Sequence, residues 1–199
     1  MKTTVQSKRS QIATRTMDGR KQNPPDRFID LSHTSEEEIQ IVQANLQNPA
    51  HAEAVLSLVD AYSRDAMGDG KPLSDDARRR LLPGLRAHPT TLIFLAYQNG
   101  EPVGIAVCFL GFSIFAARPL VNIHDLAILS AHRGHGIGRR LLAAVERKAR
   151  EMVCCKLTLE VQEKNTRARA VYEAAGFVQA HYQHEAGGAL FLAKRLENG

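Results

Sequence analysis

Three apolar runs followed by one amphipathic segment constrain the fold of this chain more than any other feature. Runs at 91–97, 103–112 and 120–129 have the length and residue types of β-strands, and Asn99-Gly100 lies between the first two. Asn-Gly between apolar runs predicts a tight hairpin. The apolar residues that follow recur at helical spacing, namely Ile137, Leu141, Leu142, Val145, Ala149 and Met152. Strands and helices mixed in this way indicate an α/β (α+β) domain.

Local signals predict further elements on both sides of this segment, because capping residues, prolines and glycines mark their ends. These elements are a strand at 39–43, a helix opened by Asn48-Pro49, a helix capped by Ser74, a strand at 156–161, a helix at 166–175 ended by Gly176, and a hairpin of 177–184 with 189–196 around Gly187-Gly188.

Charge is concentrated at the N-terminus. The net charge is +5, and residues 1–30 carry seven Lys or Arg against three Asp. Few large apolar side chains occur there, so we expect residues 1–35 to be a disordered basic tail and 36–199 to form the folded domain. A mitochondrial presequence is the rival interpretation, but the acidic residues and the missing amphipathic stripe count against it. The near-neutral remainder argues against nucleic-acid binding.

Cysteine and hydropathy patterns exclude several classes of protein. Cys108, Cys154 and Cys155 form no CxxC pair and have no histidine at zinc spacing, so no metal site is expected. No apolar stretch is long enough for a membrane span. Without a secretory signal, the expected compartment is the cytoplasm.

A glycine-rich segment separates the third apolar run from the amphipathic helix. It reads Arg133-Gly134-His135-Gly136-Ile137-Gly138 and is followed by Arg139. Glycines let successive backbone N–H groups converge at a helix N-terminus, where they bind phosphate. A Rossmann fingerprint would need glycine at Arg139, and a P-loop would need Gly-Lys-Ser/Thr. A pyrophosphate is the natural ligand, and a tight strand-to-helix turn is the alternative.

Two motifs together resemble the GNAT superfamily of N-acetyltransferases. Arg133, Gly136 and Gly138 fit the signature Arg/Gln-x-x-Gly-x-Gly/Ala, and a second signature reads Asn165, Ala168, Tyr172 and Gly176-Phe177. The resemblance covers roughly residues 36–196. It implies a mixed, V-shaped central sheet flanked by about four helices. It also implies that the pantetheine arm of acetyl-CoA binds backbone groups near Leu126 and Ile128, between two splayed strands. Within the family, the chain looks closest to enzymes that act on small amines.

The resemblance and the residue chemistry together suggest catalytic roles. Tyr172 is the candidate acid, because its ordinary pKa of about 10 keeps it protonated at neutral pH. His124 is the candidate base, with an ordinary pKa near 6.5; small-amine enzymes often have an acidic residue there. Asn165 either contacts the cofactor arm or caps a helix. Candidate substrate-side residues are Asp125, Phe112 and Asp65. His124 and Asp125 would face opposite ways unless a β-bulge intervenes.

The expected function is therefore acetyl transfer from acetyl-CoA to a primary amine, with a small molecule as acceptor. A protein or peptide N-acetyltransferase is one alternative, and a non-catalytic acyl-CoA-binding regulatory module is another. The expected partners are acetyl-CoA and the amine, without nucleic acid or membrane, and a homodimer remains open.

Overall fold

The computed structural model describes residues 38–180 and 191–194. Its strands are β1 (Ile39–Gln43), β2 (Thr91–Gln98), β3 (Glu101–Ser113), β4 (Arg118–Ile128) and β5 (Leu157–Leu159). Its helices are α1 (Pro49–Ser63), α2 (Asp75–Ala87), a 3₁₀ turn at Ser130–His132, α3 (Ile137–Glu151) and α4 (Thr166–Ala174). The expected tail, residues 1–35, lies outside the described residues.

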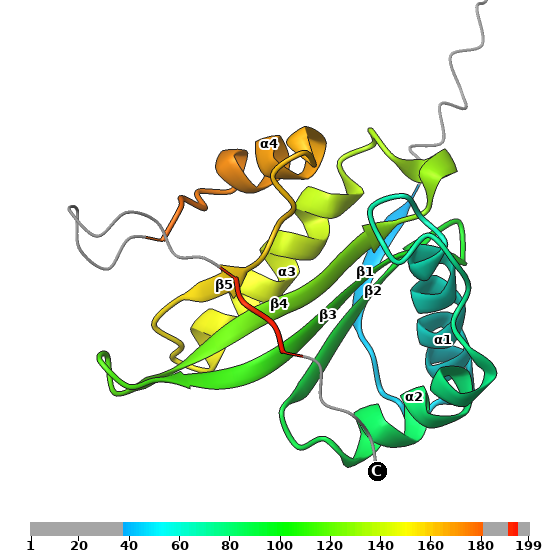
Figure 1. Cartoon of the computed structure of the whole chain (residues 1–199), viewed down its shortest axis with the longest axis horizontal. Helices are drawn as coiled ribbons and strands as arrows, with labels where there is room; N and C mark the ends of the chain where they lie inside the picture. The colour runs from blue at the N-terminus through cyan, green and yellow to red at the C-terminus, as the bar shows by residue number, and fades with distance from the viewer. Residues whose placement is uncertain (1–37, 181–190, 195–199) are drawn as a thin grey trace, which may run out of the picture. The chain divides into compact units, whose positions relative to one another are not determined.

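The five strands form one mixed sheet in the order β1-β2-β3-β4-β5 (Figure 1). Neighbours pair antiparallel except β4 and β5, which run parallel with α3 as the connection between them. The mixed α/β fold and the V-shaped sheet predicted from the sequence are both confirmed, since β4 continues well beyond its last pair with β5.

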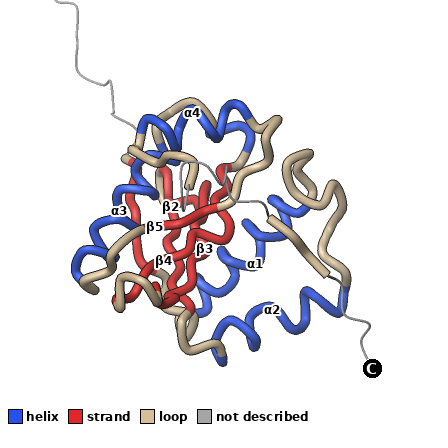
Figure 2. Tube along the Cα trace, turned by 60° about the vertical axis from the view of Figure 1, so that its left-hand side comes forward, coloured by secondary structure: helices blue, strands red, loops and turns tan. Residues whose placement is uncertain are grey.

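Each face of the sheet carries its own apolar core. Helix α3 packs on one face, where Leu141 and Val145 are fully buried. Helices α1 and α2 pack on the other face through residues such as Val55, Leu58 and Leu85. Figure 2 shows the strands between these two layers. Side chains alternate between the cores along β2, because successive residues of a strand point to opposite faces.

Helix ends follow the predicted capping chemistry. The side chains of Asn48 and Ser74 accept hydrogen bonds from the backbone N–H groups of Ala50 and Ala77, at 2.9 and 3.1 Å. The β2–β3 turn is the expected Asn99-Gly100 pair, in which both residues have positive φ, as a type I′ turn requires. These local predictions are confirmed.

The hairpin predicted at 177–184 and 189–196 is not found in the residues of it that the structure describes. Residues 177–180 and 191–194 form no strand, and Val178, Phe191 and Leu192 are 88%, 73% and 85% exposed. The apolar alternation there is therefore not matched by burial. The turn at Gly187-Gly188 lies outside the described residues. Strand β5 is also shorter than the predicted 156–161.

Within residues 38–180 and 191–194, no helix combines the length and apolar character that crossing a bilayer requires.

Candidate active site

An opening between β4 and β5 is the first component of the site. The two strands pair only from Val121 to Ile123 on β4, whereas β4 runs on to Ile128. The Leu129 N–H donates to Val103 of β3, at 2.9 Å. Because successive residues of a strand direct their backbone groups to opposite sides, those of Leu126 and Ile128 face the opening. These are the two residues that the resemblance implied for the pantetheine arm.

The glycine turn follows the C-terminal end of β4, after the 3₁₀ turn at Ser130–His132. Gly134 and Gly136 have φ of 92° and 75°, a conformation that side chains disfavour. Gly136 is the N-cap of α3, and no side chain caps this helix. The first N–H groups of α3 therefore have no side-chain acceptor, as an anion-binding helix N-terminus requires. Ile137 is 1% exposed and belongs to the α3-side core, so its side chain packs in the protein interior.

The remaining residues of the turn have different surroundings. A Cβ built on Gly136 would lie 3.6 Å from Nη2 of Arg139, so this guanidinium lies beside the turn. His135 is exposed, and its Nδ1 is 3.4 Å from the carbonyl of His132. A Cβ on Gly138 would contact Leu126 and Val171 at 3.9 and 4.0 Å. Gly138 thus lies where α3 packs against β4 and α4.

A β-bulge changes the directions of His124 and Asp125. In the β3–β4 register, Val107 pairs with Asp125 and Cys108 with Ile123, which leaves His124 as the extra residue. Asp125 shares the face of its partner Val107, in the α1-side core. The His124 ring packs edge-on against Phe109 on that face, with ring centroids 5.6 Å apart. The bulge therefore puts both side chains on the α1 side.

Tyr172 reaches the opening from the other face. Helix α4 ends in a Schellman motif: Phe177 N–H bonds to the Tyr172 carbonyl and Gly176 N–H to that of Glu173, both at 3.0 Å. The motif places the Phe177 ring edge-on against the Tyr172 ring, with centroids 5.9 Å apart. Tyr172 is 9% exposed and belongs to the α3-side core. Local helix termination thus fixes the orientation of the phenol.

Tyr62, Asp125 and Tyr172 form an electrostatically linked group across the opening. Burial raises the pKa of Asp125, and the neighbouring His124 lowers it in part. Burial also raises the pKa of Tyr172, with further increases from Tyr62 and Asp125. The pKa of Tyr62 is raised by burial, Asp125 and Asp65. The group therefore holds a carboxyl that retains its proton to a higher pH than usual, beside phenols that remain protonated.

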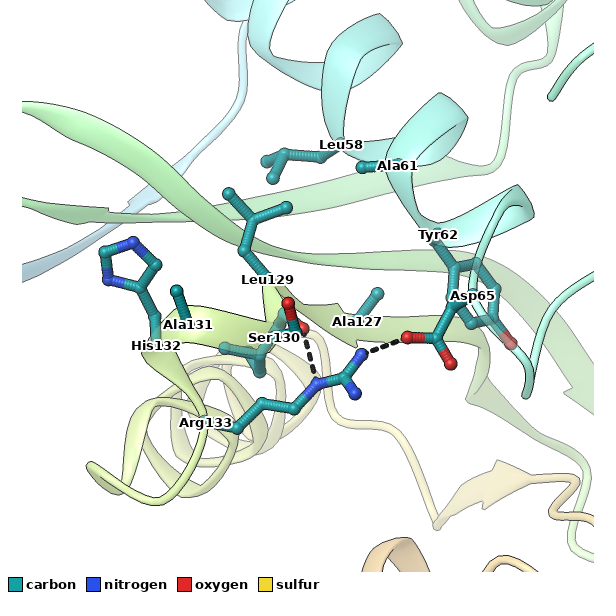
Figure 3. Close-up of a pocket in the computed structure, with 11 residues that line it drawn as sticks. Leu58, Ala61, Tyr62, Asp65, Ala127, Leu129, Ser130, Ala131, His132 and Arg133 are labelled. Atoms are coloured by element: carbon teal, nitrogen blue, oxygen red, sulfur yellow. Dashed lines mark hydrogen bonds and ion pairs between the residues drawn. The ribbon is translucent and has the colours of Figure 1, made fainter. Parts of the chain in front are cut away.

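A cavity of about 330 Å³ lies between α1 and the end of β4 (Figure 3). Leu58, Ala61 and Tyr62 line it from α1, and Ala127 and Leu129 from the strand side. At its edge the Arg133 guanidinium is ion-paired with Asp65, and its Nε donates to the Ile128 carbonyl at 2.9 Å. The Asp65 pKa is lowered by the Met67 N–H and by Arg133. Asp65 is therefore already paired with a cation.

Two predicted site residues, Asn165 and Phe112, have other surroundings than the group of Tyr62, Asp125 and Tyr172. The Oδ1 atom of Asn165 accepts a hydrogen bond from the Ala168 N–H at 3.1 Å and caps α4. Of the two roles predicted for Asn165, helix capping is the one that this oxygen performs. Phe112 is 59% exposed and pairs with Pro119 near the β3–β4 turn. It lies five residues along β3 from Val107, the partner of Asp125, or about 16 Å at ~3.3 Å per residue.

Comparison with known proteins decides the family. The sequence pattern of the Acetyltransferase (GNAT) family matches residues 55–177, more than half of the chain. The chain belongs to the GNAT family. The matched segment includes the opening, the glycine turn, Asp125 and Tyr172, so the GNAT pattern covers the whole site described above.

Individual relatives are similar over shorter segments. N-alpha-acetyltransferase 40 of Saccharomyces cerevisiae is 46% identical over 70 residues, which are 31% of this chain and 24% of the yeast protein. The aminoalkylphosphonate N-acetyltransferase of Salmonella typhimurium is 33% identical over 89 residues, 45% of this chain and 58% of the relative. The chain thus spans between about a quarter and three-fifths of the length of these curated relatives.

A solved structure has the same fold. An aminoglycoside N-acetyltransferase in complex with CoA superimposes with a TM-score of 0.62 at 21% identity, covering 80% of this chain and 96% of that one. This likeness extends the GNAT assignment to the arrangement of the elements.

Among residues 38–180 and 191–194, no three His, Cys, Asp or Glu side chains are grouped to hold a metal ion.

Sequence reasoning missed one residue of the site, Tyr62, and one pairing between two residues that it had named. Tyr62 lies on α1 and continues the helical spacing of Val55, Leu58 and Val59, a pattern that by itself indicates core packing. The pairing of Arg133 with Asp65 joins residues 68 positions apart, and neither residue alone indicates it. The sequence indicates Asp125 as a substrate-side candidate, but its partial burial depends on the bulge.

Proposed function

We propose that this chain transfers an acetyl group from acetyl-CoA to a primary amine, and that the amine belongs to a small molecule. The observation that carries the proposal is the opening between β4 and β5. The backbone of Leu126 and Ile128 faces it, the uncapped α3 N-terminus lies at its end, and the Asp125–Tyr172 group borders it. A CoA complex in a protein of the same fold supports this placement.

The described residues fit acetyl-CoA in two places. The N–H groups at Gly136–Gly138 and the Arg139 guanidinium supply donors and positive charge for the pyrophosphate. The N–H groups of Leu126 and Ile128 supply donors for the amides of the pantetheine arm, and the Leu126 carbonyl supplies an acceptor. The Ile128 carbonyl already accepts a hydrogen bond from Arg133. Acetyl-CoA supplies a thioester carbonyl that an uncharged amine attacks.

Asp125 is the residue that we propose as the general base. An ammonium has no lone pair, so a base must take its proton before attack. The raised pKa of the Asp125 carboxyl moves it toward the range in which a base accepts a proton effectively. His124 shares the same face but is exposed, and it is the alternative base.

Tyr172 is the proposed general acid. The departing thiolate gains a proton from a hydroxyl that is still protonated at neutral pH, and the raised pKa of Tyr172 satisfies this condition. Because Asp125 contributes to that elevation, the base and the acid are linked electrostatically. One group accepts a proton from the amine, and the other donates one to the sulfur.

Thiol release across a panel of amines and short peptides tests the proposal, with Tyr172→Phe as the diagnostic variant. The variant keeps the ring that packs on Phe177 and removes only the hydroxyl. We expect turnover to fall by about 10²–10⁴-fold, as for a lost general acid, with acetyl-CoA affinity unchanged by calorimetry. Wild-type turnover by Tyr172→Phe would refute the acid role.

Peptide acetylation is the second candidate, favoured by the 46% identity to N-alpha-acetyltransferase 40. A panel in which only peptides with a free N-terminus release thiol would establish it. An absence of thiol release with every acceptor, despite acetyl-CoA binding, would instead support the non-catalytic acyl-CoA-binding module.

A further inference from the structure

The loop between α1 and α2, residues 64–74, is bonded to both borders of the opening. On the β4 side, the Asp65 carboxylate pairs with Arg133, which follows the strand. On the β5 side, the Met67 carbonyl accepts from Nε2 of Gln162 at 3.3 Å. The Tyr62 hydroxyl donates to the same carbonyl at 3.5 Å. In Figure 1 the loop lies at the end of the sheet where β4 terminates.

The loop is also tied to itself and to α1. The Asp65 carboxylate accepts from the Met67 N–H at 2.9 Å, and the Asp60 carboxylate accepts from the Leu73 N–H at 3.1 Å. A Cβ on Gly68 would lie 2.2 Å from the Tyr62 carbonyl oxygen, so the chain returns tightly onto the end of α1. The bonds to Arg133 and Gln162 are the two side-chain contacts described above that join this loop to the segments following β4 and β5.

Arg133 points away from the glycine turn. Its Nε donates to Ile128 and its Nη2 contacts Asp65, so the guanidinium lies at the cavity between α1 and β4 (Figure 3). Its side chain is 31% exposed and that of Asp65 is 19% exposed. A phosphate at the α3 N-terminus would have to compete with this carboxylate for the guanidinium. Arg139, beside Gly136, has no such carboxylate partner among the described residues.

We propose that Arg133 and Asp65 are a positioning pair that holds the α1–α2 loop against the end of β4, beside the cavity between α1 and β4 in which we place the amine acceptor, so that this signature arginine governs acceptor binding instead of phosphate binding. The inference rests on the proposed function. Asp65 accordingly does not attract the substrate amine, because its carboxylate already accepts from Arg133 and from the Met67 N–H. Acceptor recognition is left to the uncharged side chains lining the cavity and to Asp125.

A double-mutant cycle with Asp65→Asn, Arg133→Gln and the double variant tests the pair. Each single variant is expected to raise the KM for the amine about three- to tenfold, and the double variant no further, because residues in contact are not additive. The calorimetric Kd for acetyl-CoA should stay within about twofold of wild type for all three, since no phosphate contact is lost. Arg139→Gln is the matched control, for which we expect the opposite split: weaker acetyl-CoA binding and an unchanged amine KM.

Two results would overturn the proposal: weaker acetyl-CoA binding in Arg133→Gln but not in Asp65→Asn, or multiplicative effects of the two changes on KM. Hydrogen exchange of residues 64–74 provides a readout that does not need turnover. Equal acceleration in both single variants, without further acceleration in the double variant, is the expected result. If the wild-type protein acetylates no acceptor, the proposed function fails, but the exchange measurements still test the Arg133–Asp65 pair. Unchanged exchange of residues 64–74 in both single variants would overturn the positioning role of this pair.

Discussion

Replacement of Asp125 by Asn separates the catalytic cost of losing a half-buried carboxyl from the effect of that loss on stability. Asn has nearly the same shape and cannot take a proton from an amine. We expect kcat to fall by about 10²–10⁴-fold, which is about 3–6 kcal/mol of transition-state free energy at about 1.4 kcal/mol per tenfold. Acetyl-CoA affinity should not change, because the cofactor contacts on β4 are backbone groups.

Stability should move in the opposite direction. Burial raises the folded-state pKa of Asp125 above its unfolded value, so the native state binds more protons in that interval. The contribution of this group is fully present below the unfolded pKa and is lost as pH rises through the folded pKa. Each unit of elevation is worth about 1.4 kcal/mol. At pH 7 the Asn variant should therefore melt at or above the wild-type temperature, by about 2–4 °C per kcal/mol for a chain of this size.

Steady-state kinetics and thermal melts from pH 4 to 8 measure both effects, with His124→Ala as the matched control from the same bulge. The wild-type kcat should rise with pH from the acidic side, with a midpoint above the ordinary range of an aspartate. His124→Ala should keep most of this rise. Its midpoint should move slightly to higher pH, because His124 lowers the Asp125 pKa and the variant removes it. Wild-type kcat in Asp125→Asn together with a large loss in His124→Ala would refute the assignment of the base.

Two further predictions concern residues with positive φ. Gly136→Ala puts a Cβ on a residue with φ of 75°, a conformation that costs about 1–2 kcal/mol, and should also weaken acetyl-CoA binding by calorimetry. The control Gly100→Ala, at φ of 85° in the β2–β3 turn, should destabilise without changing affinity; equal affinity loss in both would remove the turn from the cofactor site. Val153 has φ of 56° and is 67% exposed, so Val153→Gly should raise stability by up to about 1 kcal/mol, or about 2–4 °C. Val161→Gly should not, and a lower melting temperature for Val153→Gly would contradict the reasoning.

Val153 illustrates how local chemistry sets a helix end even with an unfavourable residue. The Val153 and Cys154 N–H groups bond to the carbonyls of Arg150 and Ala149, the same Schellman pattern that ends α4. At α4 the left-handed residue is Gly176, and the sequence predicted that helix end. At α3 it is valine, which gave no such signal.

The sequence by itself determined the features that depend on neighbouring residues. Asn48, Ser74 and Asn165 each bond a backbone N–H within three positions, and Asn99-Gly100 closes a two-residue turn, so the local sequence alone specifies these structures. The two GNAT motifs are local in the same sense. They predict the glycine turn and single out Tyr172 without reference to the tertiary structure.

Only the tertiary structure decided which side chains meet. His124 and Asp125 share a face because β4 carries one more residue than β3 at the bulge, a property of the register between two strands. Tyr62 and Tyr172 approach Asp125 from opposite layers, and Arg133 meets Asp65 across 68 positions. The pKa of a carboxyl and the partner of a guanidinium depend on burial and long-range packing, and no spacing along the chain encodes either.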